Sequence, residues 1–263
     1  MTDPTPPEAT PERKPEPRPS PLTPGRMAGA ALALSVVALG AAVLPYATGG
    51  DFGGKVRAYL LANPQVLDEV LAARQAAQDG AVVDAINQAA AANPDLLAID
   101  PRDPTFGPAD AKVTVIQFFD FRCPGCKAVA PEFRALMTAH PEVRFVFKDW
   151  PILDRPDDDG STYAARAALA AHQQGKYLAV YEGLMAEPAL DRAAVDRILS
   201  ENGVALPAAQ AAITSDDVTR HIADIHTTAA ALQLHGTPTF FVNGQAQPSI
   251  DPRALNAAIE AAK

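Results

Sequence analysis

The sequence predicts an α/β fold in which a long helical insertion divides a small sheet. Residues 113–119 are rich in β-branched and aromatic side chains, as in a buried strand, and apolar residues then recur at helical spacing over 124–139. Residues 143–148 alternate as a second strand. Residues 161–233 contain only alanine-rich segments of helical period, before the apolar run 239–242. This order of elements indicates a sheet with helices inserted in its middle.

Asn243-Gly244 follows the last apolar run and predicts a hairpin turn, with a short partner strand near Ala246. A closing helix is expected over 251–262. Ahead of the first strand, 101–108 is interpreted as a connector. The domain built on the sheet should therefore cover residues 104–263, with its helical insertion at about 161–233.

Two segments at the N-terminus are not expected to belong to any core. Nine of the 25 prolines lie in the first 25 residues, mixed with charged side chains, so residues 1–26 should be a disordered cytoplasmic arm. Residues 27–48 carry no charge and are long enough for a transmembrane anchor. Basic residues precede this segment, and the positive-inside bias then places the remaining chain outside the cytoplasm. A cleaved signal sequence is the alternative, and both place the main domain in an oxidising periplasm.

Residues 52–98 are predicted to be helical. Asn63-Pro64 and Asn93-Pro94 each combine an N-cap residue with a proline at the first helical position. Asp79-Gly80 separates two apolar stripes, which consist of Val56, Leu60, Leu67 and Val70, and of Val82, Val83 and Ile86. Narrow stripes on helices favour association with other copies of the chain, and packing onto the main domain is the alternative.

Composition excludes one class of partner. The 263 residues carry a net charge of −9 and no basic stripe, which argues against nucleic acid. The hydrophobic content of 48% suffices for a core, and the acidic balance is interpreted as a solubility feature.

Both cysteines lie in Cys123-Pro124-Gly125-Cys126, where the first strand meets the first helix. We expect Cys123 at the N-cap and Pro124 at the first helical position. A sulfur at a helix N-terminus faces free N–H groups and the positive end of the dipole, both of which favour thiolate over thiol. Cys123 is therefore predicted to be the nucleophile and Cys126 the resolving thiol of a redox-active disulfide. Such a pair carries two electrons itself, so no cofactor is required.

Other interpretations of the cysteines are weaker. A zinc site needs about four ligands, but the chain has no second cysteine pair and its five histidines show no ligand spacing. A structural disulfide that closes so small a loop would stabilise little. We therefore predict no metal site. The remaining metal alternative is that the two thiols bind Cu(I) as soft ligands.

A second motif, Gly236-Thr237-Pro238-Thr239, precedes the apolar run 239–242. Together with Cys-Pro-Gly-Cys and the helical insertion between them, it resembles the DsbA family of thioredoxin-fold thiol–disulfide oxidoreductases, over residues 104–263. The resemblance implies that the Thr237-Pro238 bond is cis and lies against the active-site sulfurs. It also implies that the exposed backbone there pairs with an extended substrate peptide.

The helical segment resembles another group. Residues 56–64, together with Val66 and Leu67, resemble the N-terminal segment of proteins related to ScsC (suppressor of copper sensitivity). In some of these the segment builds a trimeric stalk, and the proteins act as isomerases or in copper handling. The resemblance therefore implies a homo-oligomer, such as a trimer of catalytic domains on one stalk.

The sequence departs from the DsbA pattern at several positions. Gln117 stands where many members have a glutamate, six residues before the first cysteine, and it cannot titrate. Asp120 is nearer and charged, but the sequence leaves its direction open. Pro124-Gly125 lacks the histidine of strongly oxidising members, which predicts a weaker oxidant. His235, three residues before Pro238, could supply some positive charge to the sulfurs; the favoured alternative is that it is merely solvated.

Lys148 and Asp149 end the second strand and are predicted to be surface charges. The sequence as a whole thus predicts a membrane-anchored thiol–disulfide oxidoreductase in the periplasm. Its expected partners are protein thiols and disulfides and a redox partner that recycles the pair. The alternatives are an oligomeric isomerase or reductase and a copper-handling protein.

Overall fold

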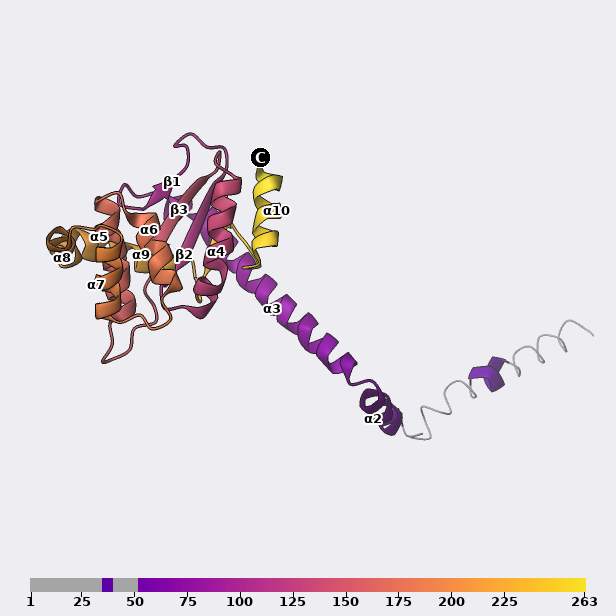
Figure 1. Ribbon diagram of the computed structural model, residues 1–263. Helices are drawn as coiled ribbons and strands as arrows, with labels where there is room; N and C mark the ends of the chain where they lie inside the picture. The colour runs from indigo at the N-terminus through magenta and orange to yellow at the C-terminus, as the bar shows by residue number, and fades with distance from the viewer. Residues whose placement is uncertain (1–34, 40–51) are drawn as a thin grey trace, which may run out of the picture. The chain divides into compact units, whose positions relative to one another are not determined.

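The structure, a computed structural model, describes residues 35–39 and 52–263 (Figure 1). The chain divides into two compact units, of which the first ends at Val70 and the second comprises Leu71–Lys263. The predicted arm 1–26 lies outside the described residues, and so does the predicted anchor 27–48 except for the short helix 35–39. No helix within the described ranges is both long and apolar enough to cross a membrane.

The predicted helical segment 52–98 is helical. It consists of α2 (Phe52–Ala62), α3 (Gln65–Ala92) and the 3₁₀ helix η1 (Pro94–Leu97). The expected break at Asp79-Gly80 is absent, because α3 runs through both residues; a glycine inside a helix costs only about 1 kcal/mol relative to alanine. Asn63 does not cap α3 through its side chain, because its side-chain oxygen accepts from the Gln65 side chain (3.4 Å), while its side-chain nitrogen donates to the Tyr59 carbonyl of α2 (2.9 Å).

A five-stranded sheet in the order β1-β3-β2-β4-β5 organises the second unit. The central strands β2 (Thr114–Phe119) and β3 (Arg144–Asp149) are parallel, and every other neighbouring pair is antiparallel. The predicted strands are confirmed, with β4 at Thr239–Val242 and β5 at Gln245–Ala246. The edge strand β1 (Thr105–Phe106) was not predicted, because two residues inside a proline-flanked connector show no period.

Helices cover both faces of this sheet (Figure 1). Helix α4 (Pro124–Ala139) connects β2 to β3, and α10 (Pro252–Ala262) closes the chain beside it. The predicted insertion is helical, as expected. It comprises α5 (Gly160–Gln173), α6 (Tyr177–Ala186), α7 (Arg192–Glu201), α8 (Leu206–Ile213) and α9 (Asp216–Ala231). Strand, helix and strand followed by helices and a hairpin form a thioredoxin-like α/β fold.

Alternation along β2 divides the core into two clusters. Val115 and Phe119 belong to the larger cluster, which contains the buried residues of α4, α6 and α10. Ile116 and Phe118 belong to the other, which contains residues of α9 and also Ile86 and Ala90 of α3. The second apolar stripe of the helical segment thus packs partly on the sheet, which was the alternative to oligomerisation.

The hairpin turn predicted at Asn243-Gly244 is confirmed. Both residues have positive φ, 46° and 81°, as this kind of turn requires. Asn243 also holds the turn to the central strand, because its side-chain oxygen accepts the Thr114 N–H (2.8 Å). The turn thereby fixes β4 against β2, and β4 begins directly after the Thr237-Pro238 motif.

Candidate active site

The two cysteines occupy different environments at the start of α4. Cys123 is the N-cap, with extended backbone angles, and Pro124 is the first helical residue, as the sequence predicted. Cys123 is 8% exposed, whereas Cys126, one turn into the helix, is completely buried. Both are free thiols in this structure. Only Cys123 is therefore in a position to meet a reaction partner from outside.

The electrostatic environment separates the two thiols further. The pKa of Cys123 is lowered to about 5, mainly because the Cys126 thiol hydrogen-bonds to its sulfur. Burial opposes this shift, and smaller contributions that lower the pKa come from Thr237 and from the backbone of Cys126 and Gly125. The pKa of Cys126 is raised far above its ordinary value, first by burial and then by its bond to Cys123. One sulfur is thus a thiolate at neutral pH, and the other is a protonated donor beside it.

The Thr237-Pro238 motif lies against these sulfurs. The peptide bond is cis, as the resemblance implied. Cys123 Sγ lies 3.2 Å from the Thr237 carbonyl oxygen, to which the protonated thiol donates. The contact follows from the antiparallel pairing of β2 with β4, in which Phe118 lies opposite Thr239. Cys123 comes shortly after β2 and Thr237 shortly before β4, so this pairing brings the two segments together. The motifs are 114 residues apart in sequence but form one site.

Gly125 faces the same motif. A Cβ atom placed on Gly125 would lie 3.4 Å from Pro238 Cδ and 3.7 Å from Cys123 Sγ, in ordinary van der Waals contact with both. The backbone of Gly125, which carries no side chain, therefore lies close to both the Cys123 sulfur and the Pro238 ring. No clash requires a glycine at this position.

Asp120 is buried and points away from the sulfurs, into the loops that support the site. One carboxylate oxygen accepts the Arg122 N–H (2.7 Å) and the Ser161 hydroxyl (2.9 Å). The other accepts the backbone N–H groups of Ile152 (2.7 Å) and Leu153 (3.0 Å). Asp120 thus joins the turn before Cys123 to the loop after β3 and to the start of α5. It positions the active-site turn and has no free lone pair aimed at a thiol.

Gln117 is completely buried on the sheet face that α4 covers. Its side-chain oxygen lies 3.5 Å from the Tyr181 hydroxyl, which donates to it. Burial, and next the nearby Cys126, raise the pKa of Tyr181 above its ordinary value. Gln117 and Tyr181 are therefore both neutral at physiological pH, and this pair occupies the position where many DsbA-like proteins have a glutamate.

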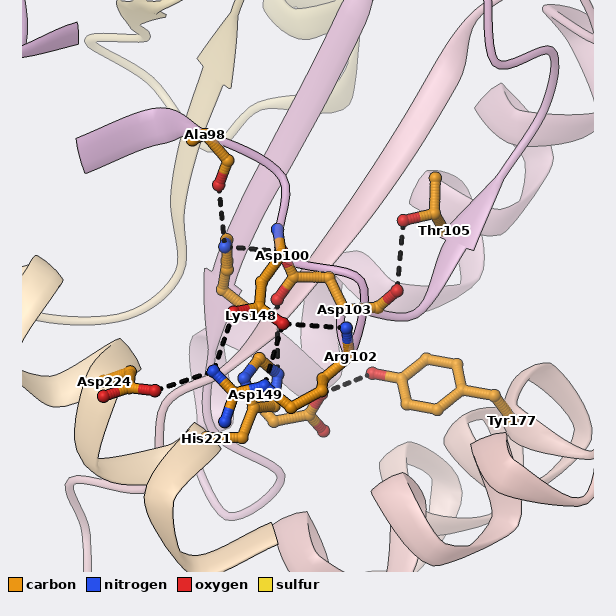
Figure 2. Close-up of polar contacts among 10 residues, drawn as sticks. All are labelled: Ala98, Asp100, Arg102, Asp103, Thr105, Lys148, Asp149, Tyr177, His221 and Asp224. Atoms are coloured by element: carbon orange, nitrogen blue, oxygen red, sulfur yellow. Dashed lines mark hydrogen bonds and ion pairs between the residues drawn. The ribbon is translucent and has the colours of Figure 1, made fainter. Parts of the chain in front are cut away.

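The prediction that Lys148 and Asp149 are surface charges is wrong. Lys148 is 5% and Asp149 1% exposed. Figure 2 shows Lys148 in a buried polar cluster, where its ammonium group contacts an Asp103 carboxylate oxygen (2.6 Å) and donates to the Ala98 carbonyl (3.3 Å). The other Asp103 oxygen lies 3.3 Å from His221 Nε2. These contacts connect the segment before β1 to β3 and α9. Pairing of the charges is required here, because an unpaired charge is costly to bury.

Asp149 points to the opposite face of the sheet, where an oxygen of its carboxyl group accepts the Tyr177 hydroxyl (2.9 Å; Figure 2). Burial raises its pKa to about 8, although the Tyr177 hydrogen bond lowers it. A period-two pattern from Phe145 through Phe147 reaches Asp149 and could have indicated that its side chain faces the core. Burial of Asp149 was not predicted, because a charged residue at a strand end is usually exposed.

His235 does not join the site as a hydrogen-bonding group. Its side chain is exposed on the approach to Pro238, and no hydrogen bond to either sulfur is present among the described residues. The described part of the chain also contains no group of three or more His, Cys, Asp and Glu side chains that could hold a metal ion.

The fold and the paired sulfurs define a thioredoxin-fold dithiol protein. A family model described as thioredoxin matches residues 100–261, and the chain therefore belongs to the thioredoxin family. A second model, described as the N-terminal domain of copper resistance protein ScsC, matches residues 51–79, so the ScsC-like segment predicted from the sequence is confirmed.

Solved structures agree with this assignment. A thioredoxin-like oxidoreductase from Silicibacter pomeroyi is 39% identical, with a TM-score of 0.59, over 65% of this chain and 97% of that protein. A linker-deletion mutant of Proteus mirabilis ScsC is 23% identical with a TM-score of 0.59, over 79% and 90% of the two chains, and supports the fold alone.

Curated relatives include a Na⁺/H⁺ antiporter, NhaA 3, of Salinispora tropica, which is 32% identical over 170 residues. The match covers 64% of this chain but only 26% of the antiporter. The chain thus spans about a quarter of the length of that relative.

Proposed function

We propose that the protein is a thiol–disulfide oxidoreductase that exchanges disulfides with client proteins through Cys123 and Cys126. One observation supports this most strongly: the sulfur of Cys123, a residue that is 8% exposed and has a pKa of about 5, accepts a hydrogen bond from the completely buried Cys126 thiol. A structural pair of cysteines needs no such difference. An exchange enzyme needs this difference, because one sulfur must react with the client and the other must react only after the mixed disulfide has formed.

The oxidising direction uses the pair as follows. A client thiolate attacks the Cys123 sulfur of the Cys123–Cys126 disulfide, and Cys126 leaves with the electron pair and takes up a proton. A second client thiolate attacks the client sulfur of the mixed disulfide and releases Cys123 as a thiolate. The client loses two electrons and two protons; the cysteine pair gains the two electrons, Cys126 keeps one proton, and the other passes to solvent. The reducing direction is the same sequence in reverse.

The low pKa of Cys123 favours its release in the second step, because the sulfur of lower pKa is the better leaving group. The Thr237 carbonyl and the Pro238 ring flank this sulfur. We assign them the role of shaping the edge along which the client backbone lies. Residues 104–263 act in the periplasm in this proposal, with 27–48 as the membrane anchor. A separate redox partner reoxidises or rereduces the pair.

The test is exchange activity in the full-length protein and two variants. Cys123→Ala should abolish exchange, whereas Cys126→Ala should accumulate mixed disulfides with clients, because the resolving thiol is missing. Equal rates of alkylation of the two thiols at neutral pH would contradict the assignment. Activity should persist with a chelator present; its loss would instead favour the Cu(I)-binding alternative.

A second candidate function is that of a multimeric isomerase. It is favoured by the ScsC-like match at residues 51–79 and by large apolar side chains that are exposed on α2 and the first turns of α3. These side chains are Phe52, Val56, Tyr59, Leu61, Leu67, Val70 and Leu71. Several catalytic domains on one stalk would raise the effective concentration of sulfurs around a misfolded client. Light scattering of the full chain should then give a multiple of 27.6 kDa, and a monomer would favour the simple oxidase.

A further inference from the structure

The buried thiol of the cysteine pair has to exchange a proton inside the core. Cys126 is completely buried, and burial raises its pKa far above the ordinary value, so it is protonated whenever it is not in a disulfide. Gln117, on the sheet face that α4 covers, cannot titrate. Asp120 already accepts four hydrogen bonds from other groups. A titratable group that serves this thiol must therefore come from another element.

Asp149 brings a carboxyl group to the same sheet face from β3. Gln117 lies opposite Phe147 in the parallel pair of β2 and β3, and Asp149 follows two residues later, on the same side of the strand. Gln117 and Asp149 are both buried. Among the described residues, neither Gln117 Nε2 nor Asp149 Oδ1 has a hydrogen-bond partner. The core therefore contains a carboxyl oxygen that no structural hydrogen bond uses.

Tyr181 of α6 links this carboxyl group to the thiol. Its hydroxyl donates to Gln117 Oε1 (3.5 Å), and its ring stacks on that of Tyr177 with centroids 6.2 Å apart. The Tyr177 hydroxyl donates to the second carboxyl oxygen of Asp149 (2.9 Å). After burial, which has the largest effect, Cys126 and Asp149 both raise the pKa of Tyr181, because a negative charge on either disfavours a phenolate nearby. Tyr181 is thus close to both groups.

The groups around Asp149 leave it as the member of this set that titrates near neutral pH. Burial raises its pKa to about 8, the Tyr177 hydrogen bond lowers it, and the charge of Asp103 raises it. The pKa of Tyr177 is itself well above the ordinary value, mainly because of burial. His172 of α5 contacts the Tyr177 ring, and burial lowers its pKa, so it is neutral. Lys148 points to the other face of the sheet, where it pairs with Asp103.

We propose that Asp149 exchanges the proton of Cys126, with Tyr181 as the carrier between them. The inference rests on the proposed function. When the Cys123–Cys126 bond opens, Cys126 leaves with the electron pair and takes a proton from Tyr181, the Asp149 carboxyl group replaces that proton, and solvent reprotonates the carboxylate. When Cys126 attacks a mixed disulfide, its proton moves the other way, to the Asp149 carboxylate. Asp149 acts on the thiol through Tyr181, so it is a positioning residue.

The experiment follows the reduced full-length protein as it reacts with dithiodipyridine at a series of pH values. Attack by Cys123 releases one thiopyridone, and attack by Cys126 on the mixed disulfide releases the second, so two absorbance phases separate the two steps. In the wild type the rate of the second phase should rise with pH, with a midpoint near about 8, because only the carboxylate accepts a proton. Asp149→Asn should remove this midpoint and slow the second phase about hundredfold at about pH 9.

Two tyrosine variants and a control distinguish this role from a structural one. Tyr177→Phe should move the midpoint upward by about one pH unit, because the hydrogen bond that lowers the pKa of Asp149 is lost. Tyr181→Phe should slow the second phase without moving the midpoint. Tyr163→Phe is the matched control, since Tyr163 is also buried and donates to a carboxylate, that of Asp196 (2.6 Å), within the helical insertion. It should leave both phases and the midpoint unchanged.

The outcomes separate the proton exchange from the proposed function. A wild-type midpoint that persists in Asp149→Asn, or that does not move in Tyr177→Phe, would overturn the role of Asp149. An unchanged second phase in Tyr181→Phe would overturn the carrier and the proposal with it. If Asp149→Asn does not fold, the Tyr177→Phe midpoint decides. Absence of any second phase in the wild type would overturn the proposed function as well.

Discussion

Replacing Cys126 by alanine should raise the pKa of Cys123. The hydrogen bond from the Cys126 thiol is the largest single cause of the low pKa of Cys123, which is about 5. A hydrogen bond to a charged group contributes about 1.5–3 kcal/mol, and about 1.4 kcal/mol corresponds to one pKa unit. Loss of the donor should therefore raise the pKa by about one to two units, to between about 6 and 7.

The remaining contributions should keep the variant below an ordinary thiol. The Thr237 side chain and the backbone of Gly125 stay in place in Cys126→Ala, and both lower the pKa of Cys123. The ultraviolet absorbance of the thiolate, followed against pH, measures the midpoint directly. Alkylation with iodoacetamide at each pH provides an independent titration.

Cys126→Ser is the matched control for this titration. Its hydroxyl can still donate to the Cys123 sulfur, so its midpoint should lie closer to that of the wild type than the alanine variant does. Midpoints that coincide in all three proteins would refute the reasoning, and would assign the low pKa to the start of α4 instead. A wild-type midpoint near about 8.5 would contradict a stabilised thiolate altogether.

Three further predictions concern the buried polar groups. Asp120→Asn should destabilise the protein by about 2 kcal/mol or more in urea unfolding, because an amide cannot accept four hydrogen bonds; an unchanged midpoint would contradict its positioning role. Lys148→Met should cost about 3–5 kcal/mol, since Asp103 is left as a buried charge, and adding Asp103→Leu should recover much of this; no recovery would contradict the pairing. Asp149 keeps its proton up to about pH 8 in the folded state but loses it near about pH 3.9 when unfolded, so wild-type stability should fall as pH rises through this window. Asp149→Asn should remove that slope in urea unfolding at a series of pH values, and an identical slope would contradict the burial argument.

The sequence was sufficient to predict the fold because each central strand and its neighbouring helix show a clear period. The strand before Cys123 and the helix after it begin and end within a residue or two of their predicted bounds. The proline at the first helical position fixed where α4 begins. The strand β1 was not predictable, because its two residues depend on pairing with β3 rather than on their own pattern.

The site was predictable to the extent that it depends on short motifs. Cys123 and Pro238 meet because β2 and β4 are neighbours, and both motifs adjoin these strands. The direction of Asp120 was not predictable, since its hydrogen-bond donors come from a distant loop and from α5. The main cause of the low Cys123 pKa was also missed. The helix dipole was expected to lower the pKa of Cys123, whereas the hydrogen bond from the Cys126 thiol, one turn away, contributes most to this shift.

The second half of α3 shows the limit of reasoning from stripes. An apolar stripe indicates that a helix face is covered, but not by what. Ile86 proved to be covered by the sheet of the same chain, whereas Val82 remains exposed beside the active site. Whether a residue of the stripe is covered or exposed depends on residues far away in sequence, such as Ala246 and Ile250.

The central claim is that Cys123 and Cys126 form one reversible two-electron couple that reacts through Cys123. Equilibration of the full-length protein in glutathione buffers of graded potential, with mass-tag alkylation read at each cysteine, tests it directly. The account predicts that both thiols disappear together, at one potential, and that transient glutathione adducts occur on Cys123 alone. Independent titration of the two cysteines, or adducts mainly on Cys126, would contradict it.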